Sequence, residues 1–188
     1  LFLHEAERIY SDRLVSLKDT SAYAKIAAGI GKSKFPFAGA EISTYFNDAV
    51  PKPLILAHFA NGTEKLSYDQ SGDMKGLTEI LKTCLTKYND ENATMDLVLF
   101  EDAVRHVCRI SRIIQQPGGH ALLVGVGGMG KRSLARLAAY ICAFSLELIT
   151  ITQTYGIADL KEDLQKFYWK AGVKGQGVLF LFTDSQIT

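Results

Sequence analysis

The sequence predicts an α/β fold with an open parallel sheet in the second half of the chain, preceded by a mostly helical segment. The prediction rests on three short apolar runs typical of buried parallel strands, at 120–124, 146–152 and 178–182. Segments with helical periodicity, 131–144 and 158–171, separate these runs. In the first segment, the side chains predicted to point inward are Leu134, Leu137, Ala138 and Ile141. The order strand, helix, strand, helix, strand is typical of a layered fold in which helices connect parallel strands.

The first part of the chain is predicted to be helical and then irregular. Residues 1–28 carry apolar side chains at helical spacing, and Gly29 and Gly31 interrupt the pattern. Residues 29–53 contain three of the four prolines and are predicted to form a loop. A short apolar run at 54–59 predicts a strand, and the polar residues 60–73 predict another loop.

Two further helices are predicted before the sheet begins. The first covers about 77–88 and ends in a polar turn at 89–92. The second covers 97–114, with apolar side chains on one face, and the glycine- and proline-containing residues 115–119 end it.

Composition excludes several classes of partner. The 188 residues carry a formal net charge of +1, so bulk charge gives no reason to expect nucleic-acid binding. The most apolar stretch, 134–151, contains Arg136 and Glu147 and therefore predicts a buried helix and strand, and we expect no membrane partner. The cysteines lie too far apart for a metal site and are predicted to be buried, reduced thiols: Cys84, Cys108 and Cys142.

A glycine-rich turn stands between the first strand of the predicted sheet and the helix that follows. It fits the pattern G-x-x-x-x-G-K through Gly125, Val126, Gly127, Gly128, Met129, Gly130 and Lys131. Small residues let backbone N–H groups turn inward around an anion, and a helix N-terminus adds positive charge. Lys131 would reach the β- and γ-phosphates. The strand before the turn and the helix after it match the context of a P-loop, so the sequence predicts a P-loop NTPase with a three-layer α/β/α arrangement that binds ATP or ADP.

The position after the lysine departs from this pattern. It is normally Ser or Thr, whose hydroxyl helps to hold Mg²⁺, but here it is Arg132. Ser133 comes one residue later, which is a rotation of about 100° on a helix. We therefore expect Mg²⁺ to be weakly held or absent.

The acidic site expected at the end of a later strand is also incomplete. Only Asp184 follows the apolar run 178–182. Either Asp184 stands on the magnesium side and Ser185 replaces a water-positioning glutamate, or Thr183 replaces the first acid and Asp184 is the second. A third reading is that Asp184 only caps the next segment. Asp184 is the candidate catalytic residue, and with Ser133 a candidate Mg²⁺ ligand, and weak or no hydrolysis is expected.

Several stretches resemble the fourth AAA+ module of dynein heavy chains of the axonemal type. The resemblance is strongest from about residue 97 and lies in the stretches 98–103, 106–113, 121–134, 155–157, 162–164, 170–173 and 180–184. It extends more loosely to 3–12, the segment leading into the module. Met129 stands where the family suggests Ser, and Arg132 where it suggests Gln.

The resemblance implies a regulatory nucleotide-binding module in the six-part ring of a minus-end-directed microtubule motor. It implies an adenine pocket formed partly by Leu97, Val98 and Leu99, which could equally be core residues. Implied partners are the adjacent AAA+ modules, intermediate and light chains, and microtubules. The implied location is the cytoskeleton of the cytoplasm and the axoneme of a cilium or flagellum.

We expect residues 1–95 to be a lead-in segment and the start of the module, and 96–188 to be a P-loop core that stops after its acidic strand. Two alternatives stay open. One is a self-contained P-loop ATPase or kinase, which would need a complete magnesium site and a lid. The other is a structural ring module with a vestigial loop.

Overall fold

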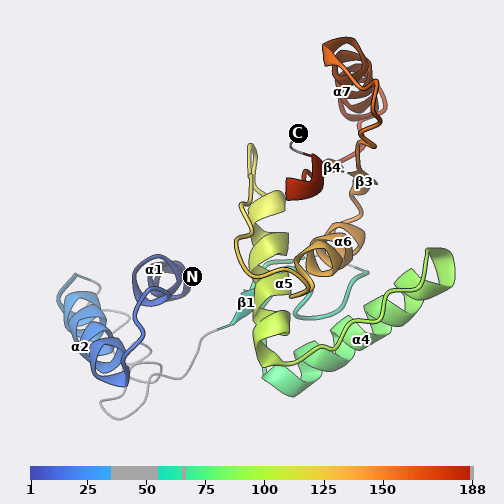
Figure 1. The fold of residues 1–188 in the computed structure, drawn as a ribbon. Coiled ribbons are helices and arrows are strands. Elements are labelled where there is room, and N and C mark those ends of the chain that lie inside the picture. Colours follow the sequence, from blue (N-terminus) through green and yellow to red (C-terminus); the bar gives the residue numbers. More distant parts are fainter. Residues whose placement is uncertain (35–54, 65–66, 187–188) are drawn as a thin grey trace. The chain divides into compact units, whose positions relative to one another are not determined.

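The computed structural model describes residues 1–34, 55–64 and 67–186. It is a mixed α/β structure, as predicted, with helices and two small two-stranded sheets (Figure 1). The chain divides into two compact units, Leu1–Leu56 and Ala57–Thr188. No helix within the described ranges is long and apolar enough to cross a membrane.

The described part of the N-terminal unit is mostly helical, but not as one helix. A short helix α1 (Phe2–Ala6) continues into the π-helical turn η1 (Glu7–Ser11), and α2 (Leu17–Lys34) begins after a break. Ser16 starts α2, because its Oγ accepts a hydrogen bond from the N–H of Asp19 at 3.1 Å.

The predicted end of this helix at Gly29 and Gly31 is wrong. α2 continues through both glycines, and Gly31 is buried together with Ala24 and Ala28. A glycine lowers helix stability by about 1 kcal/mol relative to alanine but does not block the helix, so a face of small residues can still be buried. Most of the loop predicted at 29–53 lies outside the described residues.

Near the start of the larger unit, the two-residue strands β1 (Leu56–Ala57) and β2 (Asp69–Gln70) pair with each other. β1 lies inside the strand predicted at 54–59. β2 lies inside the predicted loop at 60–73, and its exposed polar residues give no strand pattern.

Three helices form the core of this unit: α4 (Met74–Glu91), α5 (Glu101–Ile114) and α6 (Lys131–Ile141), each in contact with the other two. Their buried faces carry leucine, valine and isoleucine at helical spacing, including Leu81, Val107 and Leu137, each 0% exposed. All four side chains predicted to point inward from α6 are buried: Leu134, Leu137, Ala138 and Ile141.

The cysteine prediction is confirmed. All three are free and buried. Burial raises the pKa of the Cys108 thiol to about 12, so this side chain is a neutral core group rather than a reactive thiolate.

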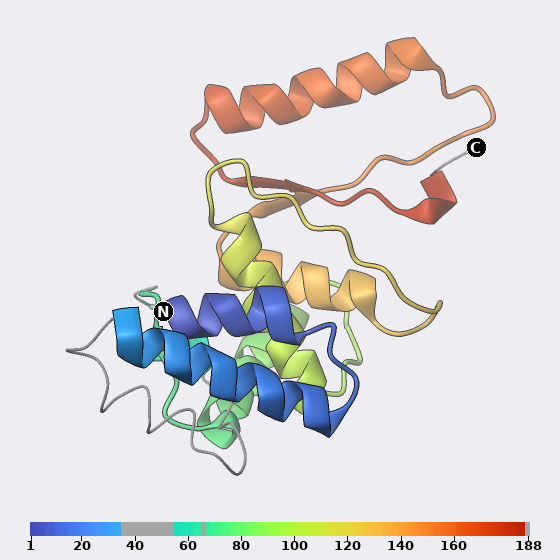
Figure 2. The same cartoon turned by 90° about the vertical axis from the view of Figure 1, so that its left-hand side faces the viewer.

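A parallel strand pair follows α6. β3 (Ser145–Glu147) and β4 (Val178–Phe180) pair in register, with Leu146 opposite Leu179, and α7 (Ile157–Gly172) connects them (Figure 2). The helix is held beside the strands by Phe167 and Phe180, whose ring centroids are 5.2 Å apart, and by an ion pair between Lys170 and Glu147. Although burial alone would raise the pKa of Glu147, the hydrogen bonds from Lys170 and Ser145 lower it. The predicted strand–helix–strand unit is therefore confirmed.

Several predicted boundaries and one predicted strand are wrong. β3 ends at Glu147 and β4 at Phe180, short of the predicted ends at 152 and 182. The helix predicted from residue 97 begins at Glu101, because 97–100 are extended and the acidic Glu101 and Asp102 favour a helix N-terminus there. The helix predicted over 131–144 ends at Ile141. Residues 120–124 are not a strand, and Leu122 is 89% exposed. A strand needs a partner, and within the described residues β3 and β4 pair with each other and not with this segment.

Candidate functional site

The glycine-rich turn joins residues 120–124, which are neither helix nor strand, to α6, and its shape depends on two of its glycines. Gly128 has a φ of 78° and Gly130 a φ of 72°, which is the left-handed region that side chains with a Cβ rarely adopt. Gly130 is also the N-cap of α6 and has no side chain with which to cap it. The first N–H groups of α6 are therefore not satisfied by a capping side chain, as they would be after Ser, Thr or Asp.

The charges in the first turn of α6 also favour an anion at this helix N-terminus. Lys131 and Arg132 stand there without any acidic residue, at the end of the helix dipole that favours anions. α4 shows the usual arrangement in the same unit, because its N-cap Asp73 accepts a hydrogen bond from the N–H of Gly76 at 2.7 Å. The N-terminus of α6 thus has the charge and the open donors that suit a bound anion.

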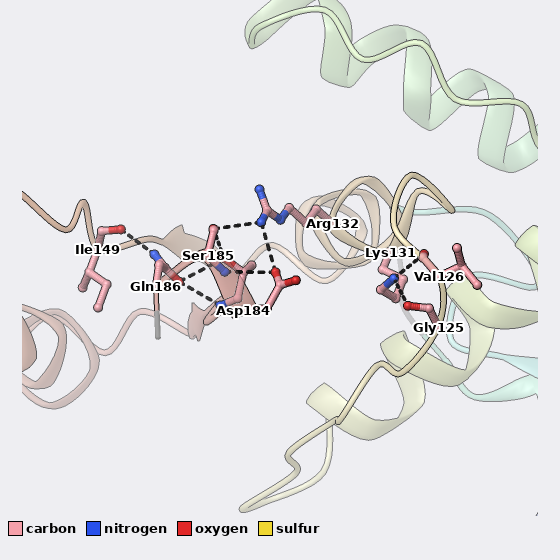
Figure 3. A network of polar contacts seen from close by, with 9 residues as sticks. Gly125, Val126, Lys131, Arg132, Ile149, Asp184, Ser185 and Gln186 are labelled. Carbon is pink, nitrogen blue, oxygen red and sulfur yellow. Dashed lines mark hydrogen bonds and ion pairs between the residues drawn. The ribbon is translucent and has the colours of Figure 1, made fainter. Parts of the chain in front are cut away.

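Lys131 folds back over the turn (Figure 3). Its Nζ donates hydrogen bonds of 2.7 Å to the carbonyl oxygens of Gly125 and Val126. These two carbonyls hold the ammonium group beside the turn, where two further features of the motif, the left-handed glycines and the helix N-terminus, also lie.

Of residues 97–99, which are predicted to border the adenine, Leu97 lies next to the glycine-rich turn. A Cβ placed on Gly130 would lie 3.6 Å from Cδ1 of Leu97, so the Leu97 side chain is in contact range of the N-cap. Asn89 fixes this segment, because its side chain accepts from the N–H of Met95 at 2.8 Å and donates to the Met95 carbonyl at 3.2 Å. Val98 is 74% exposed.

The acidic site lies in a short 3-10 helix after β4, η3 (Asp184–Gln186). Gln186 holds it in place: Nε2 donates to the Ile149 carbonyl beyond β3, and Oε1 accepts from the N–H of Thr183 at 2.8 Å. The Asp184 side chain is 97% exposed, and its Oδ1 accepts from the N–H of Ser185 at 3.0 Å.

Arg132 connects the glycine-rich turn with the acidic site. Its Nη2 donates to Ser185 Oγ at 3.0 Å and lies 3.5 Å from Asp184 Oδ1 (Figure 3). The structure therefore brings together the two positions at which the sequence departs from the P-loop pattern. Ser133 lies one position further along α6, and the described residues contain no group of three or more His, Cys, Asp or Glu side chains that could hold a metal ion.

Sequence reasoning missed Gln186, Asn89 and the contact of Ser185 with Arg132. A glutamine or asparagine among polar residues gives no signal of its own, because its role depends on the carbonyl that the fold places beside it. The arginine and the serine are each visible in the sequence, and only the packing of η3 beside α6 shows that they meet.

Comparison with known proteins identifies the module. The family model described as "P-loop containing dynein motor region D4" matches residues 95–188. The chain belongs to this family. The predicted resemblance to dynein heavy chains is thereby confirmed.

Dynein relatives match along the whole chain. It is 56% identical over 187 residues to the dynein alpha chain of the flagellar outer arm of Chlamydomonas reinhardtii. It is 46% identical over 187 residues to dynein axonemal heavy chain 11 of Sus scrofa, and 45% identical over 188 residues to the ciliary dynein beta chain of Tripneustes gratilla. Each match covers 100% of this chain and 4% of the relative, so the chain spans only a small part of the relatives' length.

Proposed function

We propose that this D4 segment is a regulatory nucleotide-binding module that holds ADP or ATP and hydrolyses ATP weakly or not at all. The observation that carries the proposal is the N-terminus of α6. It combines two left-handed glycines in the preceding turn, an N-cap without a side chain, and two adjacent cations at the positive end of the helix. Both cations lower the stability of an empty helix N-terminus, and a bound phosphate would offset that cost.

The remaining site residues would suit a nucleotide whose phosphates lie at the N-terminus of α6. The N–H groups of 125–133 and the ammonium group of Lys131 would hold the phosphates, and Leu97 to Leu99 would lie towards the base. Lys131 would exchange the carbonyls of Gly125 and Val126 for phosphate oxygens, which are stronger partners because both groups are charged.

Weak hydrolysis follows from the acidic site. Phosphoryl transfer needs a metal to neutralise developing charge and a residue to orient the attacking water. Asp184 is the one carboxylate of η3, and it pairs with Arg132. Under either register of Asp184, one of the two acidic functions has no carboxylate to perform it. A self-contained kinase or ATPase is disfavoured for the same reason.

For the longer protein we propose the role that its relatives' names suggest, an axonemal dynein heavy chain of a cilium or flagellum. In such a chain, residues 96–188 would be the beginning of a three-layer α/β/α AAA+ core and residues 1–95 its lead-in. Adjacent AAA+ modules would cover exposed apolar side chains such as Leu122, Val124 and Trp169. Intermediate and light chains and microtubules would be partners of the whole motor.

The proposal is tested by titrating ADP and ATP into the 188-residue chain by calorimetry and by following phosphate release from ATP. We expect both nucleotides to bind with a stoichiometry of one and phosphate release to stay at the rate measured without protein. Sustained ATP turnover would indicate a working ATPase. No binding of either nucleotide would favour the vestigial loop of a structural module.

A further inference from the structure

Arg132 stands where the P-loop pattern places the hydroxyl that contacts Mg²⁺. Its side chain extends from the first turn of α6 to η3, where Nη2 meets Ser185 Oγ at 3.0 Å and Asp184 Oδ1 at 3.5 Å (Figure 3). These two η3 residues follow β4, in the region from which a P-loop protein normally supports its metal. The Arg132 side chain therefore links the first turn of α6 with the acidic site.

The side chains around this position do not fit a magnesium ion. Mg²⁺ requires oxygen ligands in octahedral geometry at about 2.1 Å. A guanidinium group has five N–H donors and no acceptor, so it cannot be a ligand, and its charge repels a cation. The Asp184 carboxylate, which could have been a ligand, already lies beside Arg132.

The same guanidinium group is well suited to phosphate. Arginine binds phosphate oxygens through two parallel N–H donors, with both geometry and charge in its favour. Both contacts with η3 use Nη2, so within the described residues the Nη1 and Nε donors are left for a ligand. The Arg132 side chain is 54% exposed, so it is accessible to a ligand.

We propose that Arg132 takes the place of the divalent cation and that the module binds its nucleotide without a metal. This inference rests on the proposed nucleotide function of the same site. Lys131 and Arg132 together neutralise the phosphates, and Asp184 and Ser185 orient the guanidinium group as they would otherwise orient a hydrated ion. The site would hold a nucleoside diphosphate equally well with and without magnesium.

The test measures the affinity of the 188-residue chain for ADP in a buffer with Mg²⁺ and in a buffer with EDTA. For the unmodified chain we expect the two dissociation constants to agree within about twofold, since the described residues contain no group of three or more His, Cys, Asp or Glu side chains that could hold a metal ion. Arg132→Ser should weaken binding in EDTA by about tenfold, the loss of one charge-assisted contact to phosphate. Magnesium should restore part of that affinity, because the serine hydroxyl returns a metal ligand.

Two further variants complete the test. The first separates the guanidinium group from positive charge in general, and the second is a control at an arginine outside the site. Arg132→Lys keeps the charge but loses the two parallel N–H donors, so it should stay independent of magnesium and bind ADP more weakly than the unmodified chain in both buffers. Arg13→Ser removes an exposed arginine of the N-terminal unit and should leave both dissociation constants unchanged. Circular dichroism on each variant confirms that it is folded.

The outcomes distinguish this inference from the proposed function. Binding by the unmodified chain that is ten times weaker in EDTA would overturn the inference and leave the nucleotide function standing. Absence of ADP binding in both buffers would overturn the two together. A third outcome would overturn the role of the arginine: the unmodified chain binds ADP equally well in both buffers, and Arg132→Ser does not change either affinity.

Discussion

Replacing Lys131 by alanine is expected to lower the affinity of the chain for ADP by about 100-fold. Its Nζ is held by two carbonyls at 2.7 Å, close to the turn on which the phosphates would lie. A charged hydrogen bond contributes about 1.5–3 kcal/mol, and a loss of roughly 2.7 kcal/mol corresponds to a factor of about 100. Calorimetric titration of ADP into Lys131→Ala and into the unmodified chain measures the difference.

Lys75→Ala is the matched control. Lys75 also stands in the first turn of a helix, but the N-terminus of α4 is capped by Asp73. Its removal should leave ADP affinity unchanged. Lys131→Ala should also fold at least as well as the unmodified chain, because it removes a cation from the positive end of a helix. Equal affinities in Lys131→Ala and the unmodified chain would mean that the nucleotide binds elsewhere.

Replacing Leu137 by alanine is expected to reduce the free energy of unfolding by about 3 kcal/mol, within the range found for buried leucines. Leu137 is 0% exposed and lies on α6, the helix that follows the glycine-rich turn and contacts α4 and α5. The substitution leaves a cavity in the core beside α6. Urea denaturation followed by circular dichroism measures the change.

Leu122→Ala provides the comparison, since this leucine lies in the same unit and is 89% exposed. It should change the free energy of unfolding by less than about 0.5 kcal/mol, as is usual for surface positions. A similar loss in both variants would show that residues 120–124 are packed and would contradict their exposure.

Local signals in the sequence predicted much of the fold. The periodicity of 131–144 gave α6 with the correct inward face, and the apolar runs at 146–152 and 178–182 gave β3 and β4 with a helix between them. The run at 120–124 has the same composition but lacks a partner among the described strands, and composition alone does not reveal whether one is present. Gly29 and Gly31 were wrongly predicted to end the helix. The low helix propensity of glycine is a weak preference, and burial of the helix face can outweigh it.

The candidate site was predictable in its parts but not in its assembly. The sequence alone shows a turn at 125–131 that matches the P-loop pattern. It also shows two departures from that pattern, Arg132 and the single acidic residue Asp184. Their meeting depends on Gln186, which ties η3 to the Ile149 carbonyl, and a contact between residues 37 apart has no local signature. The sequence predicts that a magnesium ligand is missing after Lys131, and the structure shows what the Arg132 side chain at that position contacts.

The central claim, that the turn at 125–131 and the N-terminus of α6 hold the phosphates, is tested most directly by nuclear magnetic resonance. The backbone amide signals of the ¹⁵N-labelled chain would be followed during addition of ADP in EDTA. The account predicts that the largest shifts occur at the N–H groups of residues 125–133 and the side-chain N–H of Arg132, with signals of α4 and α7 unchanged. Binding that shifts other amides and leaves those of 125–133 in place would contradict it.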